Sequence, residues 1–315
     1  MLYRRLGRTG LNVSELSFGA ARGASEDPER FITTVRAAVD AGVNFVDTAA
    51  GYDDGQSEAV LGEALHGRDE VIVETKYRPY DDWGPDANYT GTPEELIASA
   101  EQSLRRLKRE RLDILLGHGI RTVDSFGRFM QHGCYEAMLR LREQGKVRFI
   151  GISELSEGDG AHTILRRAVP TGAFDVVMLT VNFLLQTAID TVLPLCRAHD
   201  VGTVVMMPLN QASKTSGLVS VEAARECLRR HIARGYLPDA EPYNRDDLFD
   251  FLQPYSVPAA ALRFVLAQAI DTCCVGVRTV DRLRENLAAV DPPYLDVARR
   301  ARLRELFACI EQQER

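Results

Sequence analysis

The 315-residue chain has no arrangement of cysteines typical of a metal site. None of its six cysteines belongs to a C-x-x-C pair; they are Cys134, Cys196, Cys227, Cys273, Cys274 and Cys309. Zinc and iron–sulfur motifs need closely grouped thiolates. The sequence therefore predicts no metal, and scattered cysteines fit free thiols in a reducing compartment.

Long apolar runs and basic tracts are also missing. The most apolar long segment, Val257 to Ile270, is interrupted by Arg263 and Gln268 and is too short to span a bilayer. The amino terminus has charge but no apolar core of a secretory signal. With a net charge of −7 and no basic patch, nucleic acid is not an expected partner. We expect a cytoplasmic protein that binds neither membrane nor nucleic acid, in an oligomeric state that the sequence leaves open.

What the chain does contain is a regular alternation of short apolar runs with helical patterns. Eight such runs are Leu16–Gly19, Phe45–Val46, Val71–Thr75, Leu112–Leu116, Lys146–Ile152, Phe174–Leu179, Thr203–Met207 and Thr272–Val275. Strands that alternate with helices indicate parallel βαβ units, and eight of them close into a barrel. The predicted fold is α/β: a single (β/α)8 TIM barrel over residues 1–315.

Two segments lie outside this repeat. Residues 2–14 read as a β-hairpin that could close the barrel floor. The segment 210–254, after the seventh strand, is longer than an ordinary connection and includes a charged helical piece, Val221 to Arg234. It could form a lid over the site, or it could be a packing insertion; the sequence does not decide between them.

Four polar residues stand at or just beyond the ends of three predicted strands. Asp47 follows Phe45–Val46, and Tyr52 comes five residues later; Lys76 and His118 end the next two strands. In a barrel of parallel strands such residues meet at one mouth, where these folds do chemistry. Taken singly, Lys76 could be a structural ion pair with Asp47 and His118 a buried core histidine. Together the four predict a catalytic site.

The residue types suit the reduction of a carbonyl group. Tyrosine has a reference pKa of about 10, so it needs help to act as an acid. A neighbouring ammonium, Lys76, would lower the pKa of Tyr52, and Asp47 would orient Lys76 through a charge-assisted hydrogen bond. His118 could position the substrate oxygen.

These residues also carry a family resemblance. The segments GVNFVDTAAGYDDGQSEAVLGEAL, VETKYRP, LDILLGH and GKVRFIGIS resemble the aldo-keto reductase superfamily, and the similarity runs from Tyr3 to Asn286. The resemblance implies the barrel fold and an NADPH-dependent reduction of an aldehyde, a ketone or a related C=N group. It places Asp47, Tyr52, Lys76 and His118 on that family's four catalytic positions.

A cofactor site is expected after the eighth strand. The chain has no G-x-G-x-x-G between a strand and a helix, but a barrel can bind phosphates after strands seven and eight. By resemblance, Arg278 and Arg282 bind the 2′-phosphate of NADP, and Glu285 and Asn286 the adenine. The other residues that the resemblance assigns to the cofactor are Gly19, Ala20, Ala21, Asp47, Ser153, Glu154, Met178, Met206, Pro208, Leu209, Asn210 and Gly276.

The nicotinamide end departs from the family pattern. The family usually has asparagine, glutamine and an aromatic residue where this chain has Glu154, Met178 and Met206, which indicates an outlying member. These departures leave the reaction direction and a repurposed activity open. The substrate is not specified; the residues expected to line the mouth are Arg22, Tyr80, Trp83 and Phe183.

Two other readings compete with the reductase. Lys76 at a strand end could form a Schiff base, as in an aldolase, although Asp47 and the two arginines weigh against it. A barrel that binds NADPH without catalysis is the other. The altered nicotinamide site favours it slightly, and the intact set of four catalytic residues disfavours it.

Overall fold

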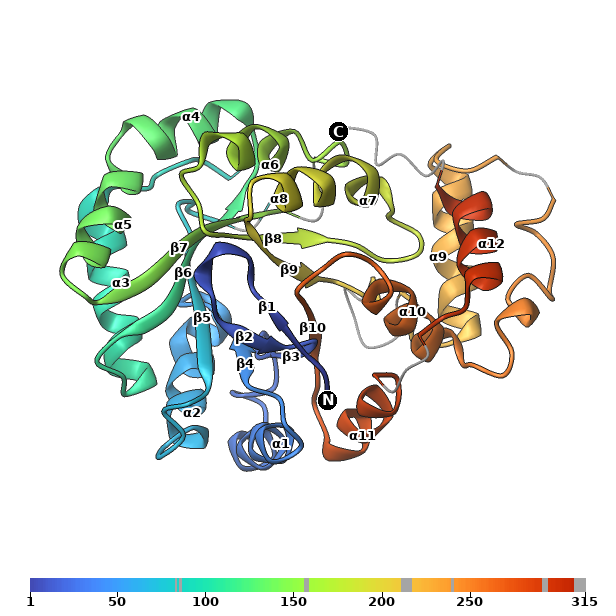
Figure 1. Ribbon diagram of the computed structural model, residues 1–315, viewed down its shortest axis with the longest axis horizontal. Coiled ribbons are helices and arrows are strands. Elements are labelled where there is room, and N and C mark those ends of the chain that lie inside the picture. The colour runs from blue at the N-terminus through green and yellow to red at the C-terminus, as the bar shows by residue number, and fades with distance from the viewer. Residues whose placement is uncertain are drawn as a thin grey trace.

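The computed structural model describes residues 1–82, 84, 87–155, 159–210, 217–238, 241–290 and 294–308. Eight parallel strands close into a barrel in the order β10-β3-β4-β5-β6-β7-β8-β9, which confirms the predicted (β/α)8 barrel (Figure 1). The strands are β3 (Leu16–Gly19), β4 (Phe45–Asp47), β5 (Ile72–Tyr77), β6 (Leu112–Ile120), β7 (Val147–Glu154), β8 (Val176–Thr180), β9 (Gly202–Met206) and β10 (Thr272–Gly276).

Helices surround the barrel, and the sequence signals at their starts are satisfied. Asp27 caps α1 by accepting a 3.0 Å hydrogen bond from Arg30 N, and Thr92 caps α3 by accepting one of 3.2 Å from Glu95 N. The helices are α1 (Pro28–Asp40), α2 (Gln56–Ala64), α3 (Pro93–Leu107), α4 (Val123–Gln131), α5 (Cys134–Glu143), α6 (Thr163–Ala168), α7 (Thr187–Thr191), α8 (Leu193–Ala198), α9 (Val221–Ala233), α10 (Val257–Leu266), α11 (Val280–Ala288) and α12 (Val297–Phe307). In the described ranges, no helix combines the length and the apolar character needed to cross a membrane.

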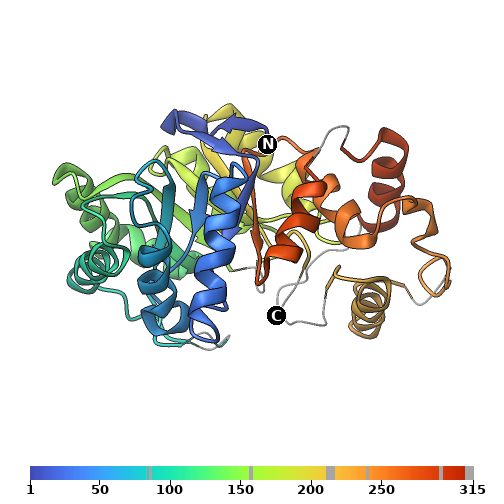
Figure 2. The same cartoon turned by 90° about the horizontal axis from the view of Figure 1, so that it is seen from below.

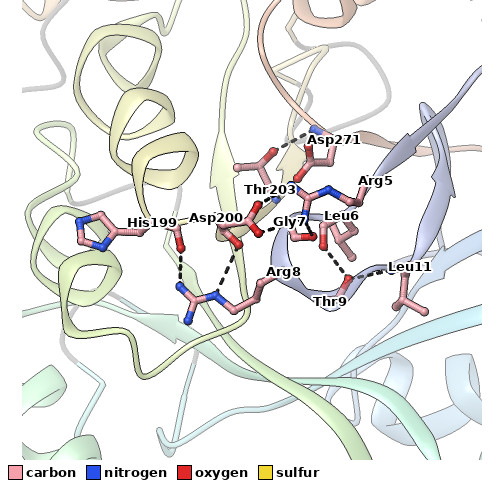
Figure 3. A network of polar contacts seen from close by, with 10 residues as sticks. All are labelled: Arg5, Leu6, Gly7, Arg8, Thr9, Leu11, His199, Asp200, Thr203 and Asp271. Atoms are coloured by element: carbon pink, nitrogen blue, oxygen red, sulfur yellow. Dashed lines mark hydrogen bonds and ion pairs between the residues drawn. The ribbon is translucent and has the colours of Figure 1, made fainter.

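The predicted amino-terminal hairpin is present and covers the floor of the barrel. Strands β1 (Tyr3–Arg5) and β2 (Asn12–Ser14) pair antiparallel, and Leu6 belongs to the apolar cluster that fills the barrel interior. The turn between them fits only without a side chain: Gly7 has φ +44°, and a Cβ there would lie 2.1 Å from Gly202 N. Figure 3 shows the polar contacts that hold this turn, including Arg5 bidentate to Asp200 at 2.6 and 2.9 Å.

The fourth strand of the barrel along the chain, β6, is longer than predicted. The sequence pattern ended this strand at Leu116, before Gly117 and His118, yet pairing with β7 continues to Ile120. The register shifts between Gly117 and Ile120, because Gly119 takes a left-handed conformation with φ +64°. His118 therefore lies within the irregular end of the strand rather than beyond it.

The insertion after β9 packs against the barrel by apolar contacts. Helix α9 matches the predicted helical piece, and Figure 2 places it toward the end of the barrel opposite the hairpin. Farther along the insertion, Phe249 stacks on Phe307 of α12 and contacts Phe183 in the segment after β8. An aromatic cluster thus joins the insertion, the loop after β8 and the last helix.

Candidate active site

Asp47 and Lys76 form a buried ion pair at the carboxyl ends of two neighbouring strands. Asp47 ends β4, and Lys76 lies near the end of β5. Both residues are buried: Asp47 is 4% exposed and Lys76 is 1% exposed. The Lys76 ammonium donates to Asp47 Oδ1 and, at 2.7 Å, to Thr48 O. Burial disfavours the ammonium, but the charges of Asp47, Tyr52 and Glu74 and the hydrogen bond to Asp47 together outweigh burial and raise the pKa of Lys76 above its ordinary value. Lys76 is therefore a held cation.

Tyr52 is placed over this pair by the loop that follows β4. Its ring centroid lies 5.1 Å from Lys76 Nζ. Burial raises the pKa of Tyr52 to about 12, and the positive charge of Lys76 opposes that rise. Lys76 does lower the pKa of Tyr52, as predicted, but burial raises this pKa by a larger amount. The phenol therefore keeps its proton through the neutral pH range.

His118 completes the group from the third strand. Its ring meets that of Tyr52 edge to face, with centroids 5.6 Å apart and an interplanar angle of 81°. Burial, with the positive charges of Lys76, Arg78 and Arg121, holds the pKa of His118 well below its usual range. A neutral imidazole beside a phenol can share a hydrogen bond with a substrate oxygen. The structure thus brings together the four residues predicted as a catalytic set.

The residues predicted to hold the phosphate end lie around the start of α11. Thr279 caps this helix by accepting a 3.3 Å hydrogen bond from Arg282 N, and the start of a helix favours an anion. Arg278 contacts Glu26 at 3.0 and 3.2 Å, and Arg282 contacts Glu285 at 2.6 Å. Two guanidinium groups at a helix start suit a phosphate, with Glu26 as a competing partner for Arg278.

Glu154, predicted at the nicotinamide end, is held by protein groups. Its carboxylate accepts a 2.8 Å hydrogen bond from Thr180 N of β8. The same carboxylate lies 2.7 Å from His162 Nδ1 at the start of α6. Burial works against a charge on His162, yet its bond to Glu154 and the charges of Glu154 and Asp159 raise the pKa of His162. Glu154 therefore joins the ends of β7 and β8 to α6.

The other predicted cofactor residues lie at the carboxyl ends of β3 and β7 to β10. Gly19 and Gly276 are register partners on β3 and β10, and Ser153 accepts a 2.8 Å hydrogen bond from Gly119 N. Met178 points into the barrel interior, where Met206 packs beside it. The remaining predicted positions are Ala20, which is buried, Ala21, which is exposed, Pro208, which is buried, and Leu209, Asn210 and Asn286, which are half-buried.

The residues predicted to contact the substrate differ in their burial. Arg22 is exposed beside the mouth, and Trp83 lies outside the described residues. Tyr80 is 6% exposed, and its hydroxyl accepts a 3.1 Å hydrogen bond from Arg121 N. The prediction for Phe183 is wrong: the ring is fully buried and packs between Phe307 and Phe264, 5.8 and 6.5 Å away, because the segment after β8 folds back onto the last helix.

One residue of the site was not predicted. Glu74 lies on β5 two residues before Lys76, is 0% exposed, and is the register partner of Asp47. The available signal was a single acid within the apolar run VIVETKY. Among the described residues, no group of three or more His, Cys, Asp and Glu side chains could hold a metal ion.

Residues 15–306 of the chain match the Aldo/keto reductase family. The chain is 31% identical over 300 residues to L-galactose dehydrogenase of Arabidopsis thaliana, covering 91% of this chain and 87% of that protein. It is 26% identical over 331 residues to the NADH-specific methylglyoxal reductase of Escherichia coli, covering 98% and 96%. The structure of an aldo-keto reductase from Klebsiella pneumoniae in complex with NADPH aligns with TM-score 0.71 and 23% identity over 97% and 95% of the two chains.

Proposed function

The chain belongs to the aldo/keto reductase family, and from that premise we propose that it reduces a carbonyl group with NADPH, using Tyr52 as the general acid. The observation that carries this proposal is the buried contact of Asp47, Lys76 and Tyr52 beside a neutral His118. The substrate is an aldehyde, a ketone or a related C=N compound of small size.

Bound NADPH would supply the hydride that the carbonyl carbon accepts, and the residues of this chain supply the proton. Tyr52, with a pKa of about 12, gives its proton to the nascent alkoxide. An alkoxide is a base of about the strength of hydroxide and binds a proton far more tightly than a phenolate does, so this transfer is downhill. Lys76 stabilises the phenolate that remains, and neutral His118 aligns the substrate oxygen.

The candidate cofactor residues lie on the strands that flank the catalytic strands and complete the barrel. Asp47, Lys76 and His118 come from β4, β5 and β6, whereas the candidate cofactor residues come from β3 and β7 to β10. Arg278 and Arg282 supply the positive charge that the 2′-phosphate of NADPH needs and that NADH does not use. The K. pneumoniae relative binds NADPH, and the E. coli relative is specific for NADH, so this is a point to measure.

A Schiff-base mechanism at Lys76 is disfavoured. Nucleophilic attack needs a neutral amine, and lysine nucleophiles have lowered pKa values. The pKa of Lys76 moves the other way, because Asp47 holds the ammonium despite its burial. A binding barrel without catalysis would have no use for a tyrosine placed over a buried ion pair.

The test compares Tyr52→Phe with wild type on a panel of small carbonyl compounds that includes methylglyoxal, followed by NADPH absorbance. We expect Tyr52→Phe to lower turnover about 10²–10⁴-fold while NADPH affinity stays nearly unchanged. Tyr135→Phe is the matched control, since that half-buried hydroxyl only donates to Ala173 O at 3.4 Å. Wild-type turnover by Tyr52→Phe would refute the assignment.

We also propose that residues 210–254 form a lid on the single domain of residues 1–315, and that the protein is cytoplasmic. Asn210, just after β9, donates to Cys227 Sγ of α9 at 3.4 Å, which links the insertion to the mouth. Deleting residues 221–238 should change cofactor release without unfolding the barrel. A large drop in melting temperature would make the insertion structural instead.

A further inference from the structure

Glu74 occupies an unusual place at the base of the catalytic group. It shares the inner face of β5 with Lys76, and its register partner on β4 is Asp47. Side chains alternate along a strand, so Glu74 and Asp47 point into the barrel side by side. On the other side its register partner on β6 is Ile114, an apolar residue of the barrel interior.

The other buried acids of the barrel have cationic or N–H partners, and Glu74 does not. Glu58 accepts from Thr75 and Arg106 at 2.6 Å each, and Glu15 from Arg4 at 3.0 Å. Within the described ranges, no donor group reaches either carboxylate oxygen of Glu74, which is 0% exposed. An ionised carboxylate without partners would be strongly destabilising in such a place.

The group that Glu74 does meet is another carboxyl. Glu74 lies beside its register partner Asp47, the residue that already binds Lys76, and the two carboxyl groups interact electrostatically. Two carboxyl groups in contact are favourable only when they share a proton. Asp47 already pairs with the Lys76 ammonium, so the shared proton belongs to Glu74. Burial and the charge of Asp47 both raise the pKa of Glu74 well above its ordinary value.

We propose that Glu74 is a protonated carboxylic acid that donates a hydrogen bond to Asp47 and thereby positions Lys76 beneath Tyr52. This inference rests on the proposed function of that site. Glu74 is a positioning residue, because it contacts Asp47 and not the substrate.

The charges around Glu74 explain why its proton matters. Asp47 and Lys76 cancel, Tyr52 is neutral, and across the barrel the Cys274 thiol of β10 is neutral too, since burial raises its pKa. Ionised Glu74 would add one uncompensated negative charge next to Lys76. It would compete with Asp47 for the ammonium and draw it away from Tyr52. Loss of the Glu74 proton should therefore set the alkaline limit of carbonyl reduction.

The protonation state is measured directly on the full-length protein. Carbon-13 NMR with glutamate labelled at the carboxyl carbon should show one glutamate still protonated at pH 7, and the signal should vanish in Glu74→Gln. The infrared difference between wild type and Glu74→Gln should show a protonated carboxyl band. Neither readout requires activity, so both hold even if the proposed function fails. The absence of a protonated glutamate in wild type would overturn the proposal. Because this measurement uses the wild-type protein, it holds even if a variant fails to fold.

The positioning role is measured by kinetics with NADPH and the fastest aldehyde of the panel. Glu74→Gln keeps a donor and should retain kcat within a few-fold while the alkaline limb moves to higher pH. Glu74→Leu loses the bond to a charged acceptor and should lower kcat about tenfold or more with little change in KM. Glu58→Gln is the control: it should lower the melting temperature through Arg106 and leave the pH profile unchanged. Wild-type kcat and alkaline limb in Glu74→Leu would overturn the proposal.

Discussion

Replacing Lys76 by methionine removes the ammonium and keeps most of the side-chain volume. The perturbation leaves Asp47 in a site where it is 4% exposed and without its ion-pair partner. It also removes the positive charge that opposes the rise of the pKa of Tyr52 caused by burial. Stability and catalysis should therefore both suffer, for separable reasons.

The loss in free energy of unfolding can be estimated in two ways. Removing one partner of a buried ion pair typically costs about 3–5 kcal/mol. The remaining carboxylate can instead take up a proton, which for an aspartate with a reference pKa of about 3.9 costs about 4 kcal/mol at pH 7. With an unfolding entropy of about 2.1 cal/mol/K per residue, 4 kcal/mol lowers the melting temperature of a chain of this length by about 6 °C.

A double-mutant cycle separates the two effects. Asp47→Asn combined with Lys76→Met leaves no unpaired charge, so the melting temperature should recover most of the loss seen in Lys76→Met. Turnover should stay low in the double mutant, because no cation remains to stabilise the Tyr52 phenolate. Thermal melts and single-turnover NADPH oxidation measure the two quantities. If the double mutant regained turnover, Lys76 would be a structural residue and the proton-transfer account would fail.

Two further predictions concern the cofactor and pH. Arg278→Ala should weaken NADPH binding about tenfold or more and leave NADH unchanged, whereas Glu26→Gln should tighten NADPH by removing a competitor for Arg278; equal losses for both cofactors would contradict the 2′-phosphate role. Because folding raises the pKa of His162, its stabilising effect is complete below about pH 6.5 and is lost as pH rises through the folded pKa. The melting-temperature difference between wild type and His162→Gln should shrink along that range, and a difference that grew with pH would contradict it.

The sequence predicted the elements whose signals are local. The barrel followed from eight apolar runs, and Asp47 and Lys76 could be placed because each ends such a run. Parallel strands bring their carboxyl ends together, so strand-end residues meet without any knowledge of the loops. The start of α3 at Pro93 followed from its cap in the same way.

The sequence could not show surroundings that long-range packing decides. Phe183 sits in a loop whose path depends on α12, more than a hundred residues later. Glu154 stays a predicted nicotinamide contact, and its partner His162, at the start of α6, could be identified only from the structure. Glu74 was visible as an acid in an apolar strand, yet its lack of a cationic partner could be known only from the neighbours on β4 and β6.

The central claim is that hydride passes from NADPH to a carbonyl carbon while Tyr52 supplies the proton. The most direct measurement is a single turnover with NADPH carrying deuterium at the reactive carbon of the nicotinamide, followed by mass spectrometry of the alcohol. We predict one carbon-bound deuterium in the product of wild type, and the same label at a rate about 10²–10⁴-fold lower in Tyr52→Phe. An alcohol without deuterium, or equal rates for the two proteins, would contradict the account.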